Sequence, residues 1–187
     1  ASGEAWAAQV VEKDGKYWYF VSTQCAEPNC KSIGVAVADS PTGPFMDAIG
    51  KPLVVDSMTP NAHPLGWWND FDPTVFIDDD GTPWLSWGNG TCFLAKLKQN
   101  MTELDSEIMA LPMENYVDGP WLYQRRSDEG QDWWYIVYAS GGTGGESISY
   151  AMAPEVTGPW TYKGQITGPA KDSFTIHPGI VDFKGHT

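Results

Sequence analysis

One pattern of apolar and polar positions recurs along the chain: an apolar strand, a polar turn with a glycine, and a second strand rich in aromatic residues. Three segments show it: Val10–Ser22 (VVEKDGKYWYFVS), Thr74–Gly88 (TVFIDDDGTPWLSWG) and Ser127–Ser140 (SDEGQDWWYIVYAS). A fourth begins at Ile180 with IVDFKG. Alternation with a period of two around a short turn predicts a β-hairpin in each segment, and no window shows the spacing of an amphipathic helix.

Further strands follow the hairpins. Alternating segments that end in Thr-Gly-Pro and an aromatic residue follow the first and third hairpins, at Ser32–Phe45 and Ser147–Trp160. Cys92–Asp105 (CFLAKLKQNMTELD) takes the same place after the second hairpin. Repeats of three or four strands at intervals of roughly 50 to 65 residues are typical of β-propeller blades. The sequence therefore predicts one all-β domain over residues 1–187, with blade-like units at about 5–60, 68–112 and 116–166 and the start of another at 174–187.

The composition is acidic and aromatic. The 187 residues include 24 Asp or Glu against 11 Lys or Arg, a formal net charge of −13, and contain 10 Trp, 8 Tyr and 7 Phe. A surface of this charge repels phosphate backbones and anionic lipid headgroups, so we expect neither nucleic acid nor a membrane as a partner. No apolar run approaches the roughly 20 residues that cross a bilayer as a helix.

Two of the three cysteines are close in sequence. Cys25 and Cys30 flank the loop AEPN, whereas Cys92 stands alone. In an oxidising compartment, secreted or periplasmic, Cys25 and Cys30 could form a local disulfide, and in a reducing one they would stay free. A zinc site is disfavoured, because no set of histidines and cysteines with ligand spacing accompanies the pair.

Two aspartates stand apart from the other carboxylates by their positions. Asp72 (NDFDPTVF) and Asp118 (ENYVDGPWLY) each precede an apolar strand, beside Pro73 or a Gly-Pro pair. Because a proline biases the residue before it towards an extended backbone, we expect Asp72 to be extended. Acids at the starts of inner propeller strands would point into the central hollow, where paired carboxylates suit cleavage of glycosidic bonds. Alternatively, an aspartate before glycine or proline only stabilises a turn.

Four segments, in this order, resemble glycoside hydrolase family 43: WAAQVVEKDGKYWYFVS, FDPTVFIDDDGTPWLSWG, YVDGPWLYQRR and IHPGIVDFKG. Members of that family are five-bladed β-propellers that act on arabinose- and xylose-containing plant polysaccharides. The resemblance implies an inverting glycoside hydrolase whose partner is a pentose-containing oligosaccharide or polysaccharide. It also implies an incomplete propeller of about three blades and the start of a fourth, without the family's first blade and its last blade or blades. A non-catalytic carbohydrate-binding propeller derived from the family is the alternative.

The resemblance also implies roles for the two aspartates. Asp118 matches the general acid, and Asp72 matches the residue that orients this acid and tunes its pKa. The family carries glutamate where this chain has Asp118. The shorter side chain withdraws the carboxyl by about 1 Å, and a displacement of that size can lower the rate about a hundredfold. The family's general base lies in its first blade and would therefore come from outside these 187 residues.

Two tryptophans and a histidine are candidate binding residues. Trp6, in Trp-Ala-Ala, resembles the family residue that packs against the sugar, and Trp87 at the end of the second hairpin is another candidate. Sugars stack their C–H faces on wide aromatic rings, although packing inside the protein is the alternative role. His177 (TIHPGIVDF) matches a family histidine near the propeller axis, where calcium or its bound water is often found. A lone histidine is an unusual calcium ligand, so His177 either supports the site or contacts the ion or its water. We expect no required cofactor, with a structural calcium as an option.

The remaining motifs predict loops and edges. Asp78–Asp80 with Gly81 is interpreted as a hairpin turn rather than a calcium loop. Gly141–Gly145 (GGTGG) lacks the lysine of a phosphate-binding loop and is expected at a hairpin tip over the rim of the pocket. His63 could line the mouth of the pocket or lie on a surface loop. Because an incomplete propeller leaves strand edges unpaired, self-association through these edges is also expected as an option.

Overall fold

A computed structural model describes residues 5–25, 30–60, 68–127, 129–141, 145–182 and 184 of the chain. Within these ranges the regular structure is β-strand apart from one short 3-10 helix, η1 (Asp56–Met58). His63 lies outside the described residues, as does the middle of the Gly141–Gly145 loop. No helix in the described part of the chain is long and apolar enough to span a bilayer.

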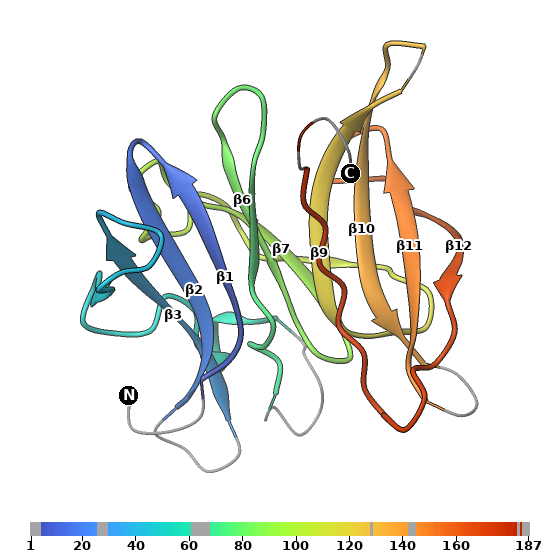
Figure 1. Cartoon of the computed structure of the whole chain (residues 1–187), viewed down its shortest axis with the longest axis horizontal. Coiled ribbons are helices and arrows are strands. Elements are labelled where there is room, and N and C mark those ends of the chain that lie inside the picture. Colours follow the sequence, from blue (N-terminus) through green and yellow to red (C-terminus); the bar gives the residue numbers. More distant parts are fainter. Residues whose placement is uncertain are drawn as a thin grey trace.

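The described strands form three four-stranded antiparallel sheets, which follow one another along the chain (Figure 1). In each sheet, strands that are neighbours in sequence are also neighbours in space. Sheet one contains β1 (Trp6–Lys13), β2 (Lys16–Gln24), β3 (Lys31–Ala38) and β4 (Met46–Asp47). Sheet two contains β5 (Thr74–Ile77), β6 (Pro83–Trp87), β7 (Cys92–Lys96) and β8 (Met109–Leu111). Sheet three contains β9 (Tyr116–Arg126), β10 (Asp132–Ser140), β11 (Ser147–Ala153) and β12 (Thr161–Thr167). The predicted all-β propeller architecture is confirmed.

Apolar side chains from alternate strand positions fill the space between successive sheets. The cluster between sheets one and two contains Phe20, Ile33, Leu85, Trp87 and Phe93. The cluster between sheets two and three contains Leu94, Leu122, Trp134, Ile136 and Tyr138. Side chains on a strand point to opposite faces in turn, so a period of two provides one apolar face for each interface. Each large side chain buried here stabilises the fold by about 1.5–3 kcal/mol.

The first strand of each sheet meets the first strand of the next. β1 contacts β5, and β5 contacts β9. The starts of β5 and β9 are joined by a hydrogen bond from Oγ1 of Thr74 to the carbonyl of Pro120 (2.7 Å). After β12 the chain returns along β9, where Ile180–Asp182 lie beside Trp121–Arg125 (Figure 1). This arrangement gathers the first residues of β5 and β9 and the returning segment in one place.

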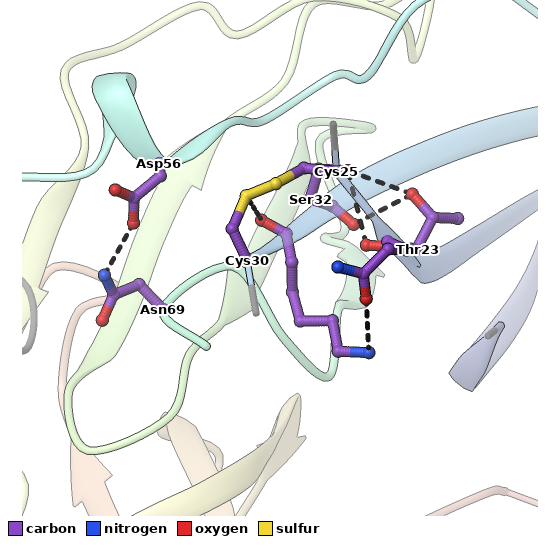
Figure 2. Close-up of a disulfide and its surroundings, with 8 residues drawn as sticks. Thr23, Cys25, Cys30, Ser32, Asp56 and Asn69 are labelled. Carbon is purple, nitrogen blue, oxygen red and sulfur yellow. Dashed lines mark hydrogen bonds between the residues drawn. A yellow bond between two sulfur atoms is a disulfide. The ribbon is translucent and has the colours of Figure 1, made fainter. Parts of the chain in front are cut away.

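Two short loops follow directly from their sequences. In the turn between β5 and β6, Oδ1 of Asp78 accepts the backbone N–H of Thr82 (2.9 Å), and Gly81 has a φ of +83°. The interpretation of this segment as a hairpin turn is confirmed. At the tip of the β2–β3 hairpin, Cys25 and Cys30 form a disulfide, beside a hydrogen bond between the hydroxyls of Thr23 and Ser32 (Figure 2).

Candidate active site

The structure brings Asp72 and Asp118 together where sheets two and three meet. Asp72 lies two residues before the start of β5, and Asp118 is near the start of β9. The backbone N–H of Gly119, the residue after Asp118, donates a hydrogen bond to Oδ2 of Asp72 (3.1 Å). The charge of Asp118 also acts on Asp72, so the two acids lie near each other where sheets two and three meet. The central hollow expected around them stays a prediction. Their catalytic roles stay predictions.

The backbone of Asp72 differs from the sequence expectation. Its φ is +53°, so the prediction of an extended backbone is wrong. This left-handed conformation is uncommon for residues other than glycine and persists where surrounding contacts stabilise it. Here the N–H of Asp72 donates to Oγ of Ser22 in sheet one (2.9 Å), while its carboxylate accepts from Gly119 in sheet three. Contacts with two other sheets thus override the local preference imposed by Pro73.

The carboxyl of Asp72 is held in its neutral form. The residue is 2% exposed, and Oδ1 has no hydrogen-bond partner among the described residues. Burial raises the pKa of Asp72 to about 8, the negative charge of Asp118 adds to this, and the N–H of Gly119 opposes it. Burial acts in this direction because a low-dielectric site disfavours the charged form. Asp72 is therefore protonated at neutral pH.

Asp118 also titrates near neutrality. Burial raises its pKa to about 7, and the charge of Glu146 raises it further, while Nδ2 of Asn89 donates a hydrogen bond to Oδ2 (3.3 Å) and lowers it. Both acids therefore hold their protons to a pH at which ordinary aspartates are already charged.

Glu146 and Asn89 are site residues that sequence reasoning missed. Glu146 follows the Gly141–Gly145 loop, and its Oε2 accepts the backbone N–H of Ile176 (2.9 Å), which ties the returning segment to sheet three. Asn89 follows β6 and stands out in sequence only as part of Asn89-Gly-Thr, a common match to the glycosylation acceptor pattern. Neither had a local signal of function, because each reaches Asp118 only when the sheets assemble.

Asp70 supports the segment that carries Asp72. It is fully buried, and its Oδ1 accepts hydrogen bonds from Oγ1 of Thr59 (2.5 Å) and Nε1 of Trp87 (3.1 Å). Gly88, the residue directly after β6, donates its N–H to the carbonyl of Phe71 (2.7 Å). Nearby, Nδ2 of Asn69 donates to Oδ1 of Asp56 (2.8 Å; Figure 2). These bonds attach the residues before Asp72 to β6 and to η1.

This geometry contradicts the role predicted for Trp87. Its side chain is 0% exposed and belongs to the apolar cluster between sheets one and two, so it has no face for a sugar. Trp6, in contrast, is 46% exposed, and its ring centroid lies 6.3 Å from that of Phe71, the residue before Asp72. An exposed indole beside Phe71, in the segment that carries Asp72, suits a sugar platform, and this role of Trp6 stays a prediction.

His177 reaches the same site from the returning segment. Its Nε2 lies 3.7 Å from Oδ2 of Asp72, and its Nδ1 lies 2.9 Å from the carbonyl of Pro178. A carbonyl only accepts, so Nδ1 carries the proton in the neutral ring and Nε2 faces Asp72 without one. Partial burial lowers the pKa of His177, which favours this neutral ring. A Cβ on Gly119 would lie 2.9 Å from Cδ2 of His177, so glycine leaves room for the imidazole.

Within the described residues, His177 does not belong to a cluster of acidic side chains that could hold calcium. Calcium takes six to eight oxygen ligands. Among the described residues, no group of three or more His, Cys, Asp or Glu side chains is placed to hold a metal ion. The calcium expected near His177 therefore stays a prediction, and no chemical step below depends on it.

A hollow on sheet one does not contain the acids. It has a volume of about 940 Å³ on the face of sheet one opposite Phe20 and Ile33, and is lined by residues such as Tyr19, Val21 and Phe45. Its lining includes none of the predicted site residues. Paired acids with raised pKa values are a stronger indicator of chemistry than volume, so we place the candidate active site at Asp72 and Asp118.

Comparisons with known proteins identify the family of this chain. A sequence model of glycosyl hydrolases family 43 matches residues 1–185, which include all three sheets. The arabinoxylan arabinofuranohydrolase of Bacillus subtilis (strain 168) is 33% identical over 88% of this chain and 35% of its own length. A xylosidase/arabinosidase of Bacteroides ovatus is 25% identical over 99% of this chain and 63% of its own length.

A solved structure shows the same fold. The α-L-arabinofuranosidase from Clostridium thermocellum ATCC 27405 matches with a TM-score of 0.80 and 30% identity, over 97% of this chain and 58% of that chain. The present chain thus spans 35% to 63% of the length of these three proteins. The family match over nearly every residue shows that the chain belongs to glycosyl hydrolases family 43.

Proposed function

We propose that this chain forms the acid-bearing part of an inverting glycoside hydrolase for arabinose- or xylose-containing polysaccharides or oligosaccharides. One observation carries the proposal: acids from two sheets, joined through Gly119, share a site where the pKa of each is raised close to or above 7. Such values keep a carboxyl protonated at working pH, as protonation of a leaving group requires.

In the proposed mechanism Asp118 donates its proton to the glycosidic oxygen as the bond to the anomeric carbon breaks. Neutral Asp72 stays beside it and orients it through Gly119, without adding a charge that would hold the proton more tightly. A water attacks the opposite face of the sugar and gives its proton to a general base, which completes hydrolysis with inversion. We assign this base to polypeptide outside these 187 residues.

The substrate class rests on two kinds of support. The named relatives include an arabinoxylan arabinofuranohydrolase and an α-L-arabinofuranosidase, so pentose-containing polymers are the proposed substrates. Trp6 provides an exposed ring beside Phe71, the residue before Asp72, on which a sugar could stack. A non-catalytic carbohydrate-binding propeller is the second candidate, because Asp118 is shorter than the glutamate usual in the family and would stand back from the sugar.

Hydrolysis of chromogenic arabinofuranosides and xylosides separates these functions. We expect turnover by the complete polypeptide to be abolished or strongly reduced by Asp72→Asn and by Asp118→Asn, with Asp79→Asn, an exposed turn residue, as the control. If the unmutated complete polypeptide binds sugars without turnover, the result supports the binding propeller. If it neither binds nor hydrolyses these sugars, a carbohydrate function is refuted. If the isolated 187-residue chain hydrolyses glycosides as a monomer at ordinary enzyme rates, the assignment of the base is wrong.

A further inference from the structure

Lys31 is buried among aromatic side chains near the site, which is unusual for a lysine. It begins β3, directly after the disulfide, and is 2% exposed. Its Nζ lies 4.9 Å from the ring centroid of Trp68 and 5.6 Å from that of Trp6. Both distances are within the range of cation–π attraction, which strengthens when the cation is removed from water. One ammonium group therefore contacts two indoles from distant parts of the chain.

The two indoles belong to an aromatic cluster of Trp6, Trp68 and Phe71. The ring centroids of Trp6 and Trp68 are 6.3 Å apart in an edge-on arrangement, and those of Trp68 and Phe71 are 5.0 Å apart. Phe71 is 6% exposed, whereas Trp6 is 46% exposed. The cluster thus has a buried side, where Lys31 lies, and an open side formed by Trp6.

The open side of the aromatic cluster is at the same edge as the acids. Phe71 directly precedes Asp72 in the sequence. Trp6 pairs with Ser22 across β1 and β2, and Oγ of Ser22 accepts the N–H of Asp72 (2.9 Å). Any ligand that lies on Trp6 is therefore close to the segment that carries Asp72.

We propose that Lys31 is a positioning residue that holds Trp6 and Trp68 as a preformed platform for a pentose-containing oligosaccharide. The ligand in this inference rests on the proposed function. Lys31 is too buried to touch the sugar and acts through the rings. A ring that is already fixed loses less side-chain freedom when a ligand binds, so affinity rises without a new contact. An uncharged sugar has no ionic attraction to the charge of Lys31. An effect of Lys31 on sugar affinity would therefore come through the position of the two rings.

Calorimetric titration of the 187-residue chain with arabinoxylo-oligosaccharides tests the proposal. Lys31→Met retains a chain of similar length without the charge and should weaken binding roughly three- to thirtyfold, the range from an exposed to a desolvated cation–π contact. Lys31→Arg keeps the cation and should stay within about twofold. Lys163→Met, at an exposed position on β12, is the matched control and should bind as the wild type does.

Proton NMR supplies a readout that does not need the ligand. The ε-methylene protons of Lys31 should be shifted upfield by the two rings, and Lys31→Met should move the indole N–H signals of Trp6 and Trp68. If the ε-methylene protons of Lys31 in the wild type have ordinary lysine shifts, the inference is overturned. This measurement needs only the wild type, so it holds even if Lys31→Met does not fold. Unchanged affinity in a folded Lys31→Met variant would overturn it too. A wild-type chain that binds none of the sugars would instead refute the proposed function and the ligand named here.

Discussion

Replacing Asp72 with asparagine is expected to stabilise the protein against unfolding, and increasingly so as the pH rises. The carboxyl of Asp72 is buried, and its burial and the charges of Asp118 and Glu146 raise its pKa to about 8. Neutral His177 is the third titratable group that faces it. Folding therefore keeps a proton on Asp72 at pH values where the unfolded chain releases it. Asparagine has the shape of the neutral carboxyl and does not titrate.

The magnitude follows from the two pKa values of Asp72. Its pKa is 3.8 as an ordinary aspartate and about 8 in the folded protein. The folded state binds more protons between these values, so the contribution of Asp72 to stability is fully present below pH 3.8 and is lost as the pH rises towards 8. One pKa unit corresponds to about 1.4 kcal/mol, so the loss is on the order of 4 kcal/mol at neutral pH.

Urea unfolding followed by tryptophan fluorescence measures this effect. The free energy of unfolding of Asp72→Asn minus that of the wild type should grow by roughly 4 kcal/mol between about pH 5 and 8.5. Any fixed penalty from the new amide group adds equally at each pH and leaves this slope unchanged. Asp79→Asn in the exposed turn is the control, and its difference should not vary with pH. A constant difference for Asp72→Asn would show that Asp72 is ionised when folded and would refute the reasoning.

Three other changes have defined outcomes. Asp118→Glu should raise kcat of the complete polypeptide on a chromogenic arabinofuranoside, by up to about a hundredfold, whereas a fall would show that the site is adapted to the shorter acid. Gly119→Ala should lower Tm more than Gly81→Ala, because both positions have positive φ but only Gly119 has His177 within 4 Å of the new Cβ; equal losses would show that the imidazole moves aside. Serine at both Cys25 and Cys30 should lower the free energy of unfolding in urea by about 2 kcal/mol, the value for so short a loop, and the wild type under reducing conditions should match it.

The strands could be predicted from sequence because their causes are local. The hairpin predicted in Val10–Ser22 is β1 and β2, with Gly15 at φ +72° in the turn. The hairpin predicted at Thr74–Gly88 is β5 with β6. The hairpin predicted within Ser127–Ser140 is wrong in its bounds, because this segment contains only β10 and its partner strand β9 ends at Arg126. Alternation and a turn glycine act over a few residues, so one chain segment carries the whole signal.

The candidate site was only partly predictable. Asp72 and Asp118 stand out because each precedes an apolar strand beside proline or glycine. Asn89 and Glu146 carry no such mark, and they reach Asp118 by contacts or charge across the fold. Trp87 was wrongly expected to face a sugar, because sequence does not say which face of a strand a neighbouring sheet will cover.

The sequence by itself determined that this chain forms repeated antiparallel sheets, and it marked two acids at the starts of strands. Only the tertiary structure decided how those acids behave. The φ of +53° at Asp72 depends on Ser22 and Gly119, each about 50 residues away and each on a different sheet. The raised pKa values depend on removal of water by all three sheets together. Strand formation depends on neighbours in the chain, whereas desolvation and hydrogen bonding at the site depend on neighbours in space.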